Sequence, residues 1–370
     1  MDEDIITKGE LNHMRFVPTN CLRVGMVVGE NLYNQAGDLL LSRGTPLTDD
    51  YIYSIERLKY NGIYIEDDIS KEIDIINVVS DKVRAKTVTG VKSAFVDVVK
   101  NPEAAKQSLS EAKQQVEQIV DEICSNPDLM INMVDMKVFD DYTYYHSVNV
   151  AILSIVIGVA LGMEREELCN LGYGALLHDI GKVFIDKDLL NKKGKLTAAE
   201  FQILKNHALL GYEHIKKGYG VSKTSCMAIL DHHERYSGGG YPNGLSGNNI
   251  SLYGRIISVA DVYDALTSDR PYRRAMIPAE AIEYIMASTE TLFDPKIVAV
   301  FVKKIAPYPI GTCVKLSDGN TGIVLENREE LCLRPKLRIF KDKEGFLDEP
   351  YIMDLADFES LNVTIVDVVS

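Results

Sequence analysis

Residues 176–182 read Leu176-Leu177-His178-Asp179-Ile180-Gly181-Lys182, in which a histidine and an aspartate follow two leucines. Adjacent side chains on a helix point about 100° apart, so a His178-Asp179 pair can address two metal ions, or one ion and the groups around it. A carboxylate can bridge two ions because it has two oxygens. This stretch therefore predicts a metal centre set in an apolar helical segment.

Further candidate ligands lie on both sides of this pair, in or beside apolar helical segments. They are His146, His207, the pair His232-His233, and Asp261. A single histidine on such a helix is more often a core residue than a ligand, but a set of this size reverses that expectation. Imidazole and carboxylate ligands without thiolates suit iron, manganese or zinc and disfavour a structural zinc site. Two ions about 3.5–4 Å apart suit phosphodiester hydrolysis, because they lower the pKa of a bridging water.

A glycine-rich loop follows the histidine pair. Residues 238–242 read Gly-Gly-Gly-Tyr-Pro, which cannot continue a helix. An ordinary loop that ends a helix is one interpretation. Beside two candidate ligands, we favour a mobile loop that lies close over the metal site.

These segments resemble the HD phosphohydrolase superfamily, and within it the HD-GYP cyclic di-GMP phosphodiesterases. The stretch 176–182 resembles the HD motif, residues 232–250 with Gly240-Tyr241-Pro242 resemble the GYP signature, and residues 255–273 resemble the block that follows it. The resemblance implies an all-helical HD domain over about residues 125–305. It also implies an enzyme with two or three metal ions that opens cyclic di-GMP to linear pGpG, and in some members on to GMP.

The resemblance also assigns roles to individual residues. Asp179 is implied as the bridging carboxylate and Lys182 as the residue that contacts the scissile phosphate; on a helix, Lys182 would share the face of the His-Asp pair. Arg270 and Arg273 match positions that bind substrate phosphates, where a guanidinium can bind through two hydrogen bonds. The implied metal ligands are His146, His178, Asp179, His207, His232, His233 and Asp261, and the implied substrate-binding residues are Lys182, Gly240, Tyr241, Pro242, Arg270 and Arg273.

The sequence departs from the family pattern at a few positions. Members with three ions have a glutamate one helical turn before the first histidine, where this chain has Tyr142. Asp140 and Asp141 would point away from the face of His146. Ser237, Ala208 and Arg273 also differ from the usual residues. We therefore expect two divalent ions per chain, most naturally iron or manganese. His214, two turns after His207, is expected to pack or to be exposed.

The rest of the chain predicts three flanking parts. Residues 1–75 alternate short strand-like runs with one helical stretch, which predicts a small α/β regulatory or docking module. Residues 76–124 carry an apolar helical stripe, interrupted at Asn101-Pro102, which predicts a helical connector. The stripe suits either a homodimer or packing onto the chain's own domain. Residues 306–370 predict a small β-rich domain after the helical domain at 125–305, so the fold class is mainly α.

The composition and the net charge indicate which broad classes of protein this chain fits. The chain has 370 residues, 46% of them hydrophobic, and a net charge of −14. These values predict a folded protein and argue against broad binding to nucleic acid. The most apolar stretch, 148–161, suits a buried helix and is short for a membrane span. The acidic N-terminus shows no signal peptide, and the scattered cysteines are typical of reduced thiols, so we expect a cytoplasmic protein.

The leading hypothesis is thus a metal-dependent phosphodiesterase of bacterial cyclic di-GMP signalling. Two alternatives stay open. The same centre could act on another cyclic dinucleotide, such as cyclic GMP-AMP. The domain could also be a non-catalytic cyclic dinucleotide sensor, although degenerate members usually lose ligands and this chain keeps them.

Overall fold

The computed structural model describes residues 14–33, 39–58, 60, 62–70, 73, 78–126, 130–131, 142–190, 192, 194–268 and 275–369. The chain forms two compact units. One is made by residues 78–130 and 140–307, and the other by the residues before 78, a short segment at 131–139 and the residues after 307.

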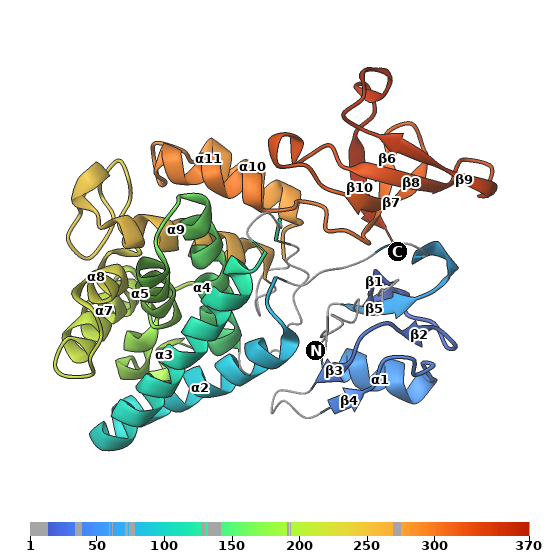
Figure 1. Ribbon diagram of the computed structural model, residues 1–370. Coiled ribbons are helices and arrows are strands. Elements are labelled where there is room, and N and C mark those ends of the chain that lie inside the picture. Colours follow the sequence, from blue (N-terminus) through green and yellow to red (C-terminus); the bar gives the residue numbers. More distant parts are fainter. Residues whose placement is uncertain are drawn as a thin grey trace, which may run out of the picture. The chain divides into compact units, whose positions relative to one another are not determined.

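The helical unit contains the candidate site (Figure 1). Its helices are α2 (Asp81–Lys100), α3 (Pro102–Cys124), α4 (Tyr142–Ala160), α5 (Arg165–Leu176), η4 (Ile180–Phe184), α6 (Lys187–Leu190), α7 (Ala198–Ile215), α8 (Lys223–Asp231), η5 (Gly247–Asn249), α9 (Leu252–Thr267), α10 (Pro278–Ala287) and α11 (Pro295–Lys304). The break between α2 and α3 confirms the predicted interruption. Asn101 caps α3 by accepting hydrogen bonds from the N–H groups of Glu103 and Ala104, and Pro102 takes the first helical position.

Helix α4 is the central helix of this unit. It packs against α2, α3, α5, α9 and α11. Contact on so many sides explains why its sequence is apolar nearly all round. An 18-residue stretch of it, Thr143–Ala160, is long and apolar enough to cross a membrane, and 72% of that stretch is buried within the protein. The sequence prediction of a buried helix here is confirmed.

The connector stripe is also buried within the helical unit. Val91, Phe95, Leu109, Val116 and Ile119 are each at most 2% exposed. They lie on α2 and α3, which pack against each other and against α4. Packing onto the chain's own domain, one of the two interpretations of the stripe, is therefore what the structure shows.

The second unit holds the sheets. The N-terminal part contains β1 (Arg15–Pro18), η1 (Thr19–Cys21), β2 (Val27–Val28), β3 (Leu32–Tyr33), β4 (Leu39–Leu41), α1 (Asp49–Arg57), β5 (Gly62–Glu66) and η2 (Asp68–Ser70). The C-terminal part contains β6 (Cys313–Leu316), β7 (Thr321–Glu326), η6 (Glu329–Leu331), β8 (Lys336–Lys341), β9 (Phe346–Asp354), η7 (Phe358–Ser360) and β10 (Ile365–Val369). The sheet orders are β1-β5-β2, β3-β4 and β10-β6-β7-β8-β9.

The two ends of the chain share a hydrophobic core in this unit. Met14 and Tyr64 from the N-terminal part pack with Cys313 and Ile323 from the C-terminal part. The buried Arg15 side chain donates to Asp67 at 2.8 Å. Small sheets at both ends and a helical middle confirm the predicted fold class, which is mainly α.

Candidate metal centre

The predicted ligands come from five places in the helical unit. His146 lies on α4, His178-Asp179 in the turn between α5 and η4, His207 on α7, His232-His233 at the end of α8, and Asp261 on α9. The structure brings all of them together. One expectation was wrong in detail: the His178-Asp179 pair lies in a turn, because α5 ends at Leu176.

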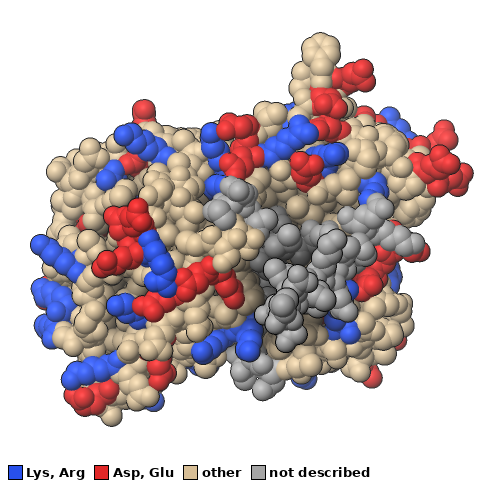
Figure 2. Space-filling model, in the orientation of Figure 1, with Lys and Arg blue, Asp and Glu red and all other residues tan. Residues whose placement is uncertain are grey.

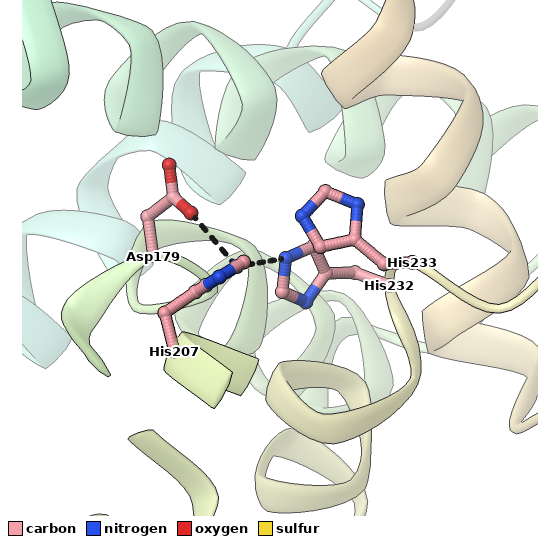
Figure 3. A group of neighbouring side chains, drawn as sticks. All are labelled: Asp179, His207, His232 and His233. Carbon is pink, nitrogen blue, oxygen red and sulfur yellow. Dashed lines mark hydrogen bonds and ion pairs between the residues drawn. The ribbon is translucent and has the colours of Figure 1, made fainter. Parts of the chain in front are cut away.

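Two groups of ligand atoms overlap at one carboxylate. Asp179 belongs both to a group with His207, His232 and His233 and to a group with His146 and His178. Within each group the ligand atoms lie within 4.8 Å of one another. Figure 3 shows the first group, in which dashed lines join Asp179 to His207 and His207 to His232. A shared carboxylate between two sets of imidazoles is the arrangement expected of a centre with two ions.

The two oxygens of Asp179 face different histidines. Oδ1 lies 3.4 Å from Nε2 of His207, and Oδ2 lies 3.4 Å from Nε2 of His178. Oδ2 is also 3.8 Å from Nε2 of His146. Asp261 also approaches both groups of ligand atoms. Its Oδ1 lies 3.1 Å from Nε2 of His146, and its Oδ2 lies 3.9 Å from Nδ1 of His233.

Backbone carbonyls orient three of the histidines. Nδ1 of His178 lies 2.7 Å from the carbonyl oxygen of Ala175. His207 and His232 make the same contact with the residue three positions earlier, at 2.8 Å each. Donation from Nδ1 leaves the lone pair of Nε2 directed at the centre, which is the tautomer that a metal ligand needs.

His146 is oriented by a carboxylate that the sequence analysis did not assign. Its Nδ1 lies 2.6 Å from Oδ2 of Asp264, a residue 118 positions away in sequence. Asn149 donates to the other oxygen of Asp264 at 2.9 Å. Asp264 follows Asp261 by one turn of α9, and that spacing is the signal that could have found it.

The donor set fits a divalent ion. Nε2 of His178 and Oδ1 of Asp179 are buried, and neither has a hydrogen-bond partner. Buried polar atoms without partners are unfavourable, and a cation held by either atom would remove that penalty. The ionisation of Asp179 also suits a cation site. Burial alone would raise the pKa of its carboxyl, whereas the Lys182 ammonium and the neighbouring imidazoles hold that pKa well below its usual range.

Lys182 lies where the sequence predicts, next to the pair. Its Nζ lies 2.5 Å from Oδ2 of Asp179, and its side chain is 32% exposed. The ammonium group is thus in contact with the centre and open to a ligand from outside. Its position on η4, three residues after Asp179, explains the contact although the pair itself is not helical.

The loop after α8 lies against the centre. The ring of Tyr241 is 4.7 Å from that of His233 and 6.3 Å from that of His207. Gly240 is packed so tightly that a Cβ atom there would lie 2.5 Å from the backbone of Glu234. The predicted close approach of this loop is confirmed.

Two residues that support this loop escaped the sequence analysis. The buried Glu234 carboxylate accepts hydrogen bonds from the N–H groups of Asn243 and Leu245, at 2.7 and 2.9 Å. Lys205 lies between two rings, with its Nζ 5.3 Å from the centre of Tyr241 and 4.8 Å from that of Phe201. Lys205 therefore places a second positive charge beside the loop.

Some predicted residues lie elsewhere or outside the described parts. His214 packs between Phe184 and Tyr219, with ring separations of 4.8 and 5.8 Å, and is not among the clustered ligands. Arg270, Arg273, Asp140 and Asp141 lie outside the described residues, as does the side chain of Tyr142. On the face drawn in Figure 2, the described Lys and Arg side chains are interspersed with Asp and Glu side chains.

The histidines of the centre predict a dependence of stability on pH in the metal-free protein. Burial lowers the pKa of His207, His232 and His233, the last to about 3. Between that value and the usual pKa of about 6.5, the unfolded chain binds more protons, so stability rises with pH. When the pH falls from 6.5 to 5, proton binding to His233 in the unfolded chain should by itself lower the free energy of unfolding by about 2 kcal/mol. Urea denaturation at the two pH values measures this change.

The matched variant for this measurement is His233→Asn, which should flatten the slope in that range. His146 opposes the effect only weakly there. Burial lowers its pKa, but Asp261 and Asp264 outweigh this and raise it to about 9, so its contribution is lost only as the pH rises toward that value. An equal slope in the variant and the wild type would contradict the assignment of the half-buried His233 as neutral at pH 5.

Comparisons with known proteins agree with this geometry. The profile of the HD domain family matches residues 100–297, and that of a KOW domain associated with the HD domain matches residues 313–370. A cyclic di-GMP phosphodiesterase of Pseudomonas aeruginosa is 39% identical over 229 residues, which cover 62% of this chain and 55% of that protein. A 3'3'-cGAMP-specific phosphodiesterase of Vibrio cholerae is 37% identical over 177 residues, which cover 48% of this chain and 38% of that protein.

The chain thus spans about half the length, or less, of these curated relatives. Among solved structures, an HD-GYP-type protein of Bdellovibrio bacteriovorus aligns with a TM-score of 0.51. The alignment covers 78% of this chain and 98% of that protein at 20% identity. At that identity the likeness supports the fold alone.

Proposed function

This chain belongs to the HD domain family, and from this premise we propose that it is a metal-dependent phosphodiesterase that opens cyclic di-GMP to linear pGpG. The observation that carries the proposal is the shared carboxylate of Asp179 between two groups of histidines. Its relatives include cyclic di-GMP phosphodiesterases. The alternative substrate is cyclic GMP-AMP, and the similarity to the Vibrio cholerae enzyme supports this alternative.

The proposed centre holds two divalent ions, iron or manganese, on the clustered histidines, Asp179 and Asp261. When bound, such ions lower the pKa of a water and neutralise charge on a phosphodiester. Lys182 would contact the scissile phosphate, since its ammonium is next to Asp179 and partly exposed. Tyr241 and Gly240 would close one side of the site, and Pro242, Arg270 and Arg273 complete the substrate-binding set that the family resemblance implies.

One experiment tests this function. The protein is purified without oxygen, loaded with iron or manganese, and incubated separately with cyclic di-GMP and with 3'3'-cyclic GMP-AMP. Chromatography of the products shows which ring is opened and whether GMP follows pGpG, and elemental analysis gives the number of ions. Two ions with turnover of cyclic di-GMP are expected. Binding of the nucleotide without turnover would identify a sensor and contradict the proposed activity.

The proposal also covers the location, the partners and the oligomeric state of the protein. We propose a cytoplasmic location, with the cyclic dinucleotide as the partner and without direct binding to nucleic acid. A homodimer through the connector stays a prediction, to be tested by light scattering. Because the buried stripe packs inside the helical unit, such a dimer would have to use exposed residues of the connector such as Val96 and Val99, which are 36% and 54% exposed.

Lys182→Met should reduce turnover and leave the metal content unchanged. The variant removes a charge beside the phosphate but keeps the aliphatic part of the side chain. A charge-assisted hydrogen bond contributes roughly 1.5–3 kcal/mol, which corresponds to about a 10- to 100-fold loss in kcat/KM. Lys187→Met, which removes an exposed lysine on the next helix, is the control. Equal kcat/KM in the Lys182 variant and the wild type would show that Lys182 does not contact substrate.

A further inference from the structure

The hydrogen bonds that orient His146 continue beyond Asp264. Asn149 donates from Nδ2 to Oδ1 of Asp264 at 2.9 Å, and its own Oδ1 accepts from Nη1 of Arg84 at 3.4 Å. Arg84 lies on α2, 65 positions before Asn149. It precedes residue 100, where the match to the HD domain profile begins. A residue of the connector is thus joined to a candidate metal ligand through two buried side chains.

We propose that Arg84 is a positioning residue for His146, so that the connector helix α2 is part of the metal centre. The inference rests on the proposed function only in requiring that the centre binds a metal ion. A guanidinium has donors alone, whereas a side-chain amide has a donor end and an acceptor end. Arg84 therefore keeps the oxygen of Asn149 toward α2 and its NH₂ group toward Asp264.

The reverse orientation of this amide would be unfavourable. It would place the oxygen of Asn149 against the Asp264 carboxylate and leave that carboxylate with one donor fewer. Asn149 is 4% exposed and Asp264 is fully buried, so water cannot replace the lost donor. Donation from Arg84 to the amide oxygen also polarises the amide and strengthens its bond to Asp264. That carboxylate in turn holds Nδ1 of His146.

The packing of α2 keeps Arg84 in place. Phe95 of α2 meets Tyr144 of α4 edge to face, with ring centres 5.6 Å apart. Helix α2 also packs against η4, which carries Lys182. Helix α2 is the first helix of the helical unit along the chain. Because Arg84 lies on α2, a rotation of this helix would change the contact of Arg84 with Asn149. The orientation of His146 would then change with it.

Titration of the full-length, metal-free protein with cobalt(II) tests the proposal. Arg84→Met should weaken the binding of cobalt by about 10-fold, the lower end of the range for outer partners of metal ligands. The visible absorption bands of the bound cobalt should also shift, because His146 changes its orientation. Arg84→Lys, which keeps a donor, should restore the bands at least in part. The control is Lys86→Met, an exposed lysine on the same helix, which should bind cobalt like the wild type.

A double-mutant cycle shows whether Arg84 acts through Asn149. Asn149→Leu should also weaken binding, and adding Arg84→Met to it should cost little more, because the two residues belong to one chain of contacts. Wild-type affinity and bands in Arg84→Met, or fully additive losses in the cycle, would overturn the proposal. Should Arg84→Met fail to fold, Arg84→Gln, which is too short to reach Asn149, takes its place. A wild-type protein that binds no cobalt would instead contradict the proposed function.

Discussion

Asp179→Ala should abolish both metal binding and hydrolysis. The carboxylate is shared by the two groups of histidines, and Asp179 is 1% exposed, so neither another side chain nor a free anion can take its place. Without it, the two groups of histidines no longer share a ligand that could bridge two cations. Elemental analysis should find the ions reduced to trace amounts, and turnover should fall below detection.

The companion variant Asp179→Asn keeps the size of the side chain and removes its charge. It should show the same losses, which would assign them to the charge and not to a cavity. Asp188→Ala, at an exposed carboxylate nearby, is the control for a general effect on folding, followed by circular dichroism. Wild-type metal content and turnover in Asp179→Ala would refute the mechanism as a whole.

Gly181→Ala should disrupt the centre almost as severely, without removing any ligand. A Cβ atom on Gly181 would lie 1.9 Å from the carbonyl oxygen of His207 and 2.6 Å from the backbone nitrogen of Gly211. Backbone atoms of a packed helix cannot yield as a flexible side chain would, so η4 and α7 must move apart. Overpacking of this kind costs typically 1–3 kcal/mol of stability or more. The movement would separate Asp179 from His207.

The measurements are thermal unfolding, metal content and turnover. Gly174→Ala is the matched control, because its Cβ would approach its neighbours only to 3.1 Å, a distance that small shifts can relieve. We expect Gly181→Ala to lose most of its metal and Gly174→Ala to keep it. A Gly181→Ala protein with full metal content would mean that the two helices can separate without disturbing Asp179 and His207.

Much of the candidate site could be predicted from the sequence, because the ligands are chemically distinctive. Histidines are few in this chain, and the structure brings those in the motifs at 178–179 and 232–233 together with His146 and His207. The Tyr241 loop was predicted from its glycines and proline, which exclude a helix. Such signals are local, since each depends on the identity of neighbouring residues.

The parts that escaped prediction depend on contacts between distant segments. Strands β9 and β10 were not predicted, because much of β9 is exposed and its sequence lacks a regular apolar alternation. The sequence could not distinguish packing of the connector stripe within its own chain from dimerisation, since an apolar stripe can pack against a helix of either the same chain or another chain. The shared core of Met14, Tyr64, Cys313 and Ile323 joins the two ends of the chain, which no local pattern shows.

The candidate ligands, the mainly helical class and the glycine-rich loop beside the candidate ligands could thus be predicted from the sequence, because residue chemistry and periodicity are properties of short segments. The groups that orient His146 became visible only in the folded chain. Asp264 meets His146 across 118 positions, and Arg84 meets Asn149 across 65. The second nitrogen of a buried imidazole needs a partner. His178, His207 and His232 find theirs three residues earlier, whereas packing between distant helices supplies the partner of His146.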